Sequence, residues 1–334
     1  EGKRDGFLRT WNDKGAITYE GAFENDVQVG THLACYPNGD KKELIHFIEG
    51  KVEGKYECFY PNGNIKYFSY FKNGLLDGEN KGFYEDGTLA FIKHFKENNP
   101  VGKHEEFFEQ KNASNKNNER GLLSSINNYD EKGDFHGQQM SYYLSGGIKT
   151  QMSYDHGVLD GLKGLWDEKG NLLEESTYVL GKLEGRHIAK NPDGSEVIYH
   201  YNNNKREGSH SIYYPQKKHG EEKIKAIEAT YKSNKLEGKA FEYAENGELI
   251  STTTYVSGLR EGPAELFHQN RKVALQVLFK QDKREGICAQ YFPSGAKNKE
   301  VLYLGDKKSG DETTYFENGK INSIYRYQNG ELEG

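Results

Sequence analysis

Glycine recurs at a spacing of 24 residues along most of this chain. The interval changes at three places, to 35, 23 and 30 residues, before Gly137, Gly208 and Gly238. Self-similarity at such a period is typical of repeat architectures, in which each unit packs against its neighbours and not around one central core. We call these residues the register glycines: Gly6, Gly30, Gly54, Gly78, Gly102, Gly137, Gly161, Gly185, Gly208, Gly238, Gly262, Gly286, Gly310 and Gly334.

A ring and two turn signals accompany the register glycines. Three residues after this ring, or four after Tyr129, every unit has Gly, Asn or Asp, types that tolerate a left-handed backbone and so predict a turn. Six of the thirteen units carry Asn-Gly or Asp-Gly with its glycine nine residues after the register glycine, as at Asn62-Gly63, which is a strong hairpin signal. The ring stands 17 residues after the register glycine, or seven before the next one where the interval changes, except that Tyr129 stands eight before Gly137: Phe23, Phe47, Phe71, Phe95, Tyr129, Tyr154, Tyr178, Tyr201, Tyr231, Tyr255, Phe279, Tyr303 and Tyr327.

The spacing also predicts which residues pair. If Asn62-Gly63 fills a two-residue turn, Gly54 lies directly across from Phe71. We expect the ring to cover that glycine and so to repair a strand weakened there. The same face would carry Tyr56, Cys58, Tyr60, Ile65, Tyr67 and Ser69, and the opposite face Lys55, Glu57, Phe59, Lys66, Phe68 and Tyr70.

These patterns predict an all-β fold, an elongated single-layer antiparallel β-meander built from about thirteen 24-residue hairpins. At about 4.8 Å per strand, some 26 strands would extend roughly 125 Å. So long a sheet must twist or curve, and we expect a concave side. We treat residues 1–334 as one continuous array, with polar insertions at 109–121 and 215–223 that enlarge two hairpin loops on the same long edge.

Composition agrees with a thin, ordered fold. Hydrophobic residues make up 34%, mean hydropathy is −0.93, and 24 tyrosines and 17 phenylalanines supply the buried area. The net charge of −6 is spread over interleaved acids and bases, which argues against nucleic acid and anionic lipid as partners. We expect no membrane span and no retained signal peptide. Three cysteines without CxxC spacing predict free thiols rather than disulfides or a zinc site.

Four segments, two near residue 70 and two at the C-terminal end, resemble a known repeat family. Tyr60-Pro61-Asn62-Gly63-Asn64-Ile65-Lys66, followed by the segment 70–78, and the C-terminal segments 315–320 and 327–334 look like the variant MORN repeat of bacterial proteins, often described as YwqK-family antitoxins. The resemblance covers nearly the whole chain and implies an elongated β-ribbon whose groove holds a partner helix or peptide. The Gly/Tyr-rich repeats of choline-binding proteins are a competing resemblance, but they have a period near 20 residues and more tryptophan.

Each candidate site also has a purely structural explanation. The aromatic ladders are expected mainly to pack the sheet, and Tyr56, Tyr60, Tyr67, Phe71, Trp166 and Tyr178 are candidate partner-binding residues. Acids recur before the register glycines, as at Glu53, but lie about 10 Å apart, too far to share a calcium ion, and turn hydrogen bonding explains them better. The eleven histidines are expected at unrelated repeat positions, so no metal site is predicted. No nucleophile with an adjacent base emerges, and we expect neither catalysis nor a cofactor.

The leading hypothesis is a non-enzymatic scaffold that binds a peptide, helix or partner protein along an aromatic-lined groove. A carbohydrate-binding or cell-envelope-binding module is one alternative, in which rings such as Trp166 stack on sugars. In another, the array targets or regulates an enzyme domain outside this chain. Few cysteines and many tyrosines favour a bacterial envelope or secreted location over a cytoplasmic one.

Overall fold

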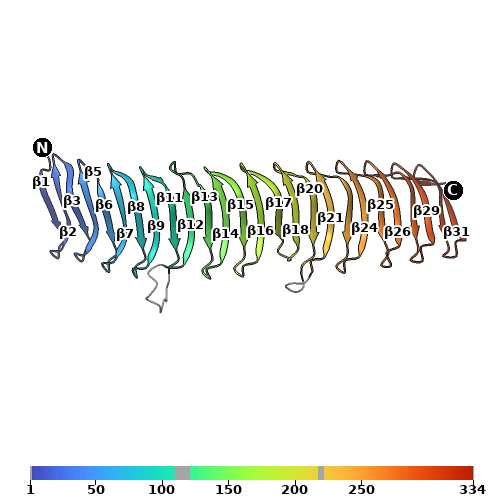
Figure 1. The fold of residues 1–334 in the computed structure, drawn as a ribbon, viewed down its shortest axis with the longest axis horizontal. Coiled ribbons are helices and arrows are strands. Elements are labelled where there is room, and N and C mark those ends of the chain that lie inside the picture. The colour runs from blue at the N-terminus through green and yellow to red at the C-terminus, as the bar shows by residue number, and fades with distance from the viewer. Residues whose placement is uncertain (1, 110–120, 217–221, 334) are drawn as a thin grey trace. The chain divides into compact units, whose positions relative to one another are not determined.

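The computed structural model describes residues 2–109, 121–216 and 222–333, which form strands and turns and contain no helix (Figure 1). None of these residues therefore belongs to a helix long and apolar enough to cross a membrane. The chain divides into two compact units, Glu1–Leu172 and Leu173–Gly334, called unit 1 and unit 2 below. Within each unit, strands that are neighbours in sequence pair antiparallel, so the predicted all-β meander is confirmed.

Unit 1 contains strands β1 to β15. Their bounds are β1 Gly6–Trp11, β2 Ile17–Glu24, β3 Val27–Cys35, β4 Lys41–Ile48, β5 Lys51–Val52, β6 Gly54–Phe59, β7 Ile65–Lys72, β8 Leu75–Phe83, β9 Leu89–Lys96, β10 Asn99–Pro100, β11 Gly102–Phe107, β12 Leu123–Tyr129, β13 Gly137–Tyr142, β14 Ile148–Asp155 and β15 Val158–Trp166.

Strands β16 to β32 follow, and all but the first residue of β16 lie in unit 2. Their bounds are β16 Leu172–Val179, β17 Lys182–Lys190, β18 Glu196–Asn202, β19 Lys205–Arg206, β20 Gly208–Tyr213, β21 Lys225–Lys232, β22 Lys235–Leu236, β23 Gly238–Tyr243, β24 Leu249–Val256, β25 Leu259–Phe267, β26 Val273–Lys280, β27 Lys283–Arg284, β28 Gly286–Tyr291, β29 Lys297–Leu304, β30 Lys307–Tyr315, β31 Ile321–Gln328 and β32 Glu331–Leu332. Continuity of the array from one unit to the next stays a prediction, and the insertions fall largely outside the described residues.

The predicted register between glycine and ring is confirmed. Gly54 pairs with Phe71 across β6 and β7, and Gly286 pairs with Tyr303 across β28 and β29. The same partnership joins ten further register glycines to their rings. Because side chains alternate along each strand, every hairpin has two faces. We call the face that carries the ring the ring face; in the third hairpin it holds Tyr56, Cys58, Tyr67, Ser69 and Phe71. The opposite face of that hairpin holds Glu57, Phe59, Phe68 and Tyr70.

The reason for glycine at these positions differs from the one predicted. Each described register glycine has a positive φ, for example 75° at Gly54, in the region that favours glycine. A Cβ added at Gly54 would meet no atom within 4 Å, so the Phe71 ring does not cover it. A ring does cover a glycine at Gly82, where an added Cβ would lie 2.2 Å from Cε1 of Phe91. The register glycines are therefore required by backbone conformation.

The hairpin turns also differ from the prediction. Tyr60 N–H donates to Asn64 O (2.8 Å) and Gly63 N–H donates to Tyr60 O (2.9 Å), so three residues form the loop, and Gly63 has φ of 87°. The glycine nevertheless meets its ring because a one-residue bulge, between Phe59↔Ile65 and Cys58↔Tyr67, restores the register. Ile65 consequently pairs with Phe59. It does not lie on the ring face, where it was expected.

The recurring acids hold consecutive turns together, as the sequence predicted. Glu53 Oε2 accepts a hydrogen bond from the backbone N–H of Asn73 in the next turn (2.7 Å), and Glu237 Oε2 accepts one from Ser257 N–H (2.7 Å). Equivalent bonds are made by Asp77, Glu184, Glu207, Glu261 and Glu285. One long edge of each unit is thus joined from hairpin to hairpin by side-chain bonds to the backbone.

The apolar core is small. Leu89, Ile92 and Phe107 are 5, 9 and 4% exposed and pack together on the opposite face of unit 1, with Phe83 and Leu123 against them. Much of the remaining buried surface is polar, including the ring-face residues Ser69, His104, Ser176 and His210. Stability therefore depends on many local contacts, as expected of a repeat array.

Candidate interaction surface

Three of the predicted partner-binding residues pack together on the ring face of unit 1. The rings of Tyr56 and Tyr67 meet edge to face with centroids 5.6 Å apart, and their hydroxyl oxygens are 3.3 Å apart. Phe71 lies 6.2 Å from Tyr56. All three are half-buried, and burial raises the pKa of Tyr56 and of Tyr67. This cluster serves as packing first, and its role in partner binding stays a prediction.

Tyr60 has a structural role of its own. Its hydroxyl donates to the backbone oxygen of Phe83 in the next hairpin, at 2.9 Å. Tyr36, Tyr84, Tyr143 and Tyr214 repeat this bond, at 2.7 to 2.8 Å, to the carbonyl at the end of the following hairpin's first strand. The Tyr60 hydroxyl is therefore engaged in joining hairpins.

The other two predicted residues lie elsewhere. Trp166 ends β15 on the opposite face of unit 1, where its ring covers Gly164: a Cβ added to that glycine would lie 2.2 Å from the indole. Tyr178 belongs to β16 of unit 2 and pairs with Leu183. Both are half-buried. The structure thus brings together Tyr56, Tyr67 and Phe71, while Trp166 lies on another face.

Histidines form a recurring feature that the sequence analysis missed. His32, His104, His187 and His210 each stand two residues after a register glycine, so the expectation of unrelated positions is wrong. His104 packs between Phe95 and Tyr129, at 5.2 and 4.6 Å. His210 stacks on Tyr199 at 4.1 Å and 10°. Burial lowers the pKa of His104 and of His210, as expected of imidazoles inside an aromatic ladder. Counting offsets from the glycines would have found them.

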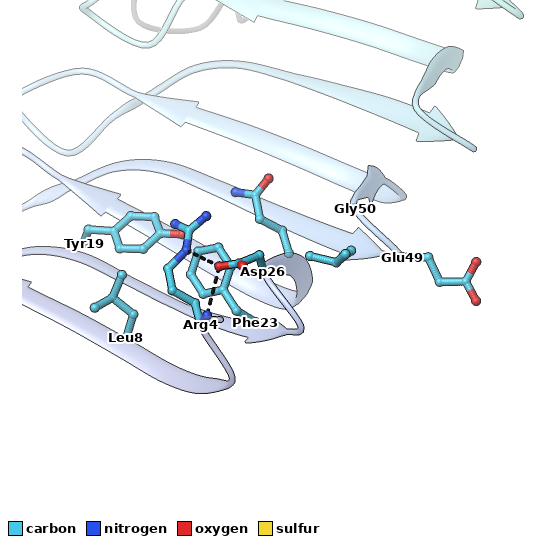
Figure 2. A pocket seen from close by; sticks show the side chains of 9 residues that line it. Arg4, Leu8, Tyr19, Phe23, Asp26, Glu49 and Gly50 are labelled. Atoms are coloured by element: carbon cyan, nitrogen blue, oxygen red, sulfur yellow. Dashed lines mark hydrogen bonds and ion pairs between the residues drawn. The ribbon is translucent and has the colours of Figure 1, made fainter. Parts of the chain in front are cut away.

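Arginine caps several rings at the turn edge. In unit 1 the Arg4 guanidinium lies 4.3 Å from the Phe23 ring and donates to Asp26 Oδ1 at 3.1 Å, beside an open depression that Leu8 and Tyr19 also line (Figure 2). In unit 2 the same arrangement joins Arg260 to Phe279 and Asp282, and Arg284 to Tyr303 and Asp306. Hydrogen bonds from the arginines lower the pKa of Asp26, Asp282 and Asp306. The aspartate fixes the cation over the ring.

An aliphatic patch lies on the opposite face of unit 2. It consists of Leu278, Ile287 and Leu302, which are 45, 62 and 36% exposed. Ile287 pairs directly with Leu302, and Leu278 Cδ2 is 3.3 Å from where a Cβ on Gly286 would stand. At the equivalent positions of two hairpins in unit 1 the pairs are polar or charged, Thr31↔His46 and Glu79↔His94, whereas in the first hairpin the pair is Phe7↔Ala22. The aliphatic patch was not predicted, because isolated Leu and Ile in a strand look the same whether they are buried or exposed.

A group of histidines and aspartates lies at the turn edge of unit 1. His156 Nδ1 is 2.6 Å from Asp130 Oδ2, and His156 Nε2 is 3.7 Å from Asp155 Oδ1. His136 Nδ1 is 3.3 Å from the same Asp155 oxygen. The hydrogen bond from His156 lowers the pKa of Asp130 to about 2, and in turn the bond to Asp130 raises the pKa of His156. Within the described part of the chain, His136, Asp155 and His156 are the group whose ligand atoms are close enough to hold one metal ion.

The thiols agree with the sequence prediction. Cys35, Cys58 and Cys288 are free. Cys35 pairs with Lys41 across the strand, whereas Cys58 pairs with Tyr67 and lies on the ring face, so these two thiols lie on opposite faces of unit 1. Burial raises the pKa of Cys288, which disfavours its nucleophilic thiolate form.

The fold defines a repeat protein of stacked β-hairpins, with ring ladders and hydrogen-bonded turns in place of a central core. Within this class, residues 52–73, 76–97, 236–257 and 308–329 match the MORN repeat variant. These matches cover hairpins of both units, and they agree with a binding scaffold made of repeats.

Other comparisons add little. No curated protein matches this chain. Among solved structures, the Photorhabdus luminescens Tc holotoxin pore is similar at 11% identity and a TM-score of 0.20, over 95% of this chain and 18% of that one. The TcdB2-TccC3-Cdc42 complex is similar at 10% identity and a TM-score of 0.13, over 99% of this chain and 20% of that one. This chain thus spans about a fifth of the length of those chains, and such scores support no argument about fold or function.

Proposed function

We propose that the chain is a non-enzymatic scaffold that binds a protein or peptide partner, with the aliphatic patch of unit 2 as its main contact. The observation that carries this proposal is the exposure of Leu278, Ile287 and Leu302 on adjacent strands. Grouped apolar side chains at a surface favour association, because contact with a partner removes them from water. The rigid sheet beneath them keeps the entropic cost of binding low.

The surroundings of the patch suit a peptide or a helix. Next to it, Asp311 and Arg326 form an ion pair (2.8 Å) on the same face, which provides polar groups at its border. Ile324 of β31, which pairs with Thr313, is 54% exposed on the same face, two strands from Leu302. An apolar centre with a polar border is the usual anatomy of a protein interface. The half-buried cluster of Tyr56, Tyr67 and Phe71 in unit 1 is a second contact that follows from the sequence prediction.

The experiment compares matched surface substitutions. A photo-cross-linking residue at Ile287 is used to capture and identify a partner, and binding of that partner is then measured with Ile287→Glu and with Thr31→Glu. The two positions are equivalent in the repeat, and only the first lies in the aliphatic patch. We expect Ile287→Glu to weaken binding roughly tenfold or more, since a charge would be buried at the interface. Equal binding by both variants would show that the patch is not the contact.

A carbohydrate-binding role is the second candidate, and an observation in unit 1 favours it. Trp11 and Phe7 are 57 and 64% exposed on the same face of β1, unlike the half-buried Trp166. Exposed aromatic faces are suited to stacking on sugar rings. Glycan-array binding that is lost in Trp11→Ala and kept in Trp166→Ala would support this role, and a blank array would remove it. Affiliation with YwqK-type antitoxins, an envelope location and the targeting of an enzyme domain elsewhere stay predictions from the sequence.

A further inference from the structure

The turn edge of unit 1 carries two histidines at one junction. At several register glycines the preceding residue is an acid that accepts a hydrogen bond from the backbone of the next turn, as Glu53 does from Asn73, whereas Val29 and Val101 precede Gly30 and Gly102. At Gly137 these two positions are His136 and His156. Their rings lie 4.8 Å apart at 34°. Two imidazoles thus lie side by side where several other hairpins have an acid bonded to the backbone of the next turn.

We propose that His136, Asp155 and His156 form a surface site for a divalent transition-metal ion of the zinc type. One ligand atom from each residue lies within 4.8 Å of the other two. Two of the separations, 3.3 Å and 3.7 Å to Asp155 Oδ1, are close to the roughly 3.3 Å edge of a tetrahedron with metal–ligand bonds of about 2.0 Å. The third edge is the separation between the ring nitrogens of His136 and His156. Since all three side chains are exposed, small side-chain rotations can shorten it.

Asp130 gives this group the second layer that a metal site needs. Its Oδ2 is 2.6 Å from His156 Nδ1, so this nitrogen carries the proton and Nε2 presents its lone pair toward Asp155 and His136. Asp130 is itself held in place, since its Oδ1 accepts hydrogen bonds from Lys132 N–H (2.8 Å) and Asp134 N–H (3.0 Å). A carboxylate fixed by its own turn orients one ligand before any metal arrives.

The ligand types decide which metal fits. Two imidazole nitrogens and one carboxylate oxygen suit Zn²⁺, Ni²⁺ or Cu²⁺, whereas Mg²⁺ and Ca²⁺ prefer oxygen ligands throughout. Three protein ligands leave one position of a tetrahedral ion open to water. Because His136 lies in the turn before β13 and His156 in the turn after β14, a bound ion would tie two consecutive turns of unit 1 together.

The test uses the full chain without an affinity tag, stripped of metal, and measures zinc binding by competition with a chromophoric chelator. We expect one tight site per chain. His136→Ala and His156→Ala should each weaken it by about tenfold or more, and Asp130→Asn by about 10- to 100-fold because the orienting carboxylate is lost. Mg²⁺ should not compete. His94→Ala is the matched control, since the His94 side chain is 45% exposed and lies 4.0 Å from an acid, Glu79, outside the group.

A second measurement keeps the outcome independent of variant folding. Ring-nitrogen NMR of the wild-type chain should show zinc-induced shifts at His136 and His156 and none at His94. Zinc binding by His136→Ala and His156→Ala at wild-type affinity, or zinc-induced shifts confined to other histidines, would overturn the proposal. A tight site that is weakened as much by His94→Ala as by His156→Ala would overturn it too.

Discussion

Unit 1 and unit 2 repeat the same hairpin, yet individual hairpins of the two units place apolar and charged side chains differently on it. Unit 1 buries Leu89 and Phe107 at 5 and 4% exposure. Unit 2 leaves Leu278 and Ile287 at 45 and 62% exposure and buries the acid Glu312 at 5%. The backbone is fixed by register glycines, rings and turn bonds that both units share. Other positions are therefore free to form a core in one hairpin and a binding surface or an ion pair in another.

The largest effect should come from the core of unit 1. Phe107→Ala removes a ring that packs against Leu89 and Ile92, and we expect a loss of about 3 kcal/mol from the transfer and cavity terms. Phe316→Ala is the matched control in unit 2, because Phe316 is 52% exposed and its removal should cost well under 1 kcal/mol. Urea unfolding followed by hydrogen exchange in β9 and β11 measures the difference. Equal losses for the two variants would mean that the unit 1 cluster is no core.

The next effect concerns the buried acid of unit 2. Glu312 Oε2 lies 2.9 Å from Lys299 Nζ and 2.5 Å from Lys308 Nζ. Burial acts to raise the pKa of Glu312, but the two lysines outweigh it and hold that pKa below the ordinary value of 4.5. The folded pKa is thus lower than the unfolded one. The ionised carboxylate stabilises the fold fully above pH 4.5, and this stability is lost as the pH falls through the folded pKa.

Glu312→Gln tests this pair. The variant leaves two ammonium groups facing a neutral amide, and we expect a loss of about 2 kcal/mol at pH 7, less than for a fully buried pair because the lysines are 26 and 29% exposed. Unfolding measured from pH 7 to pH 3 should show a smaller decline for the variant than for the wild type. An unchanged pH dependence would contradict the role given to Glu312.

Much of the backbone could be predicted from the sequence because its signals are local and repeated. The partnership of Gly54 with Phe71 follows from spacing alone. The reason for Gly54 did not follow, since spacing cannot distinguish a glycine needed for φ from one covered by a ring. Nor could spacing show that a bulge near Lys66 compensates a three-residue turn, because the two irregularities cancel in the register.

The candidate sites were less predictable, for a physical reason. Tyr56 and Tyr67 were rightly placed on one face, but in a single-layer sheet the sequence does not tell whether a ring packs on its neighbours or stays available to a partner. The group of His136 and His156 joins different turns, and its geometry depends on how consecutive hairpins stack. Leu278 and Ile287 are residue types that usually lie in a core, and only their exposure in the structure distinguishes them from core residues.

A smaller effect concerns two equivalent histidines, His104 in unit 1 and His210 in unit 2. Burial lowers both pKa values below 6.5, opposed by hydrogen bonds to the carbonyls of His94 and Ile198. The unfolded chain therefore takes up protons first, and stability should decline as the pH falls below 6.5 toward the folded pKa values. NMR titration of the two imidazoles should give values below those of the same histidines in urea. Titration at or above the urea values would contradict their burial in the ladder.

The smallest effect tests whether the ring cap of a unit 1 hairpin can replace that of a unit 2 hairpin. Arg284 caps Tyr303 at 4.1 Å and bonds to Asp306 at 2.9 Å, whereas the equivalent position in the third hairpin of unit 1 holds Leu76, next to Phe71. The arginine and the aspartate are 40 and 46% exposed, so cation–π and ion-pair contributions are each about 0.5 kcal/mol. Arg284→Leu should change the free energy of unfolding by less than about 1 kcal/mol, because the leucine also shields the ring. Its stability should depend less on salt than that of the wild type, since the exposed ion pair is gone.

Arg284→Gly, which supplies neither a cation nor an apolar cover, is the control and should lose more of the free energy of unfolding. If the leucine variant were as unstable as the glycine variant, the two ways of capping a ring would not be equivalent, and the hairpins of unit 2 would depend on their arginines.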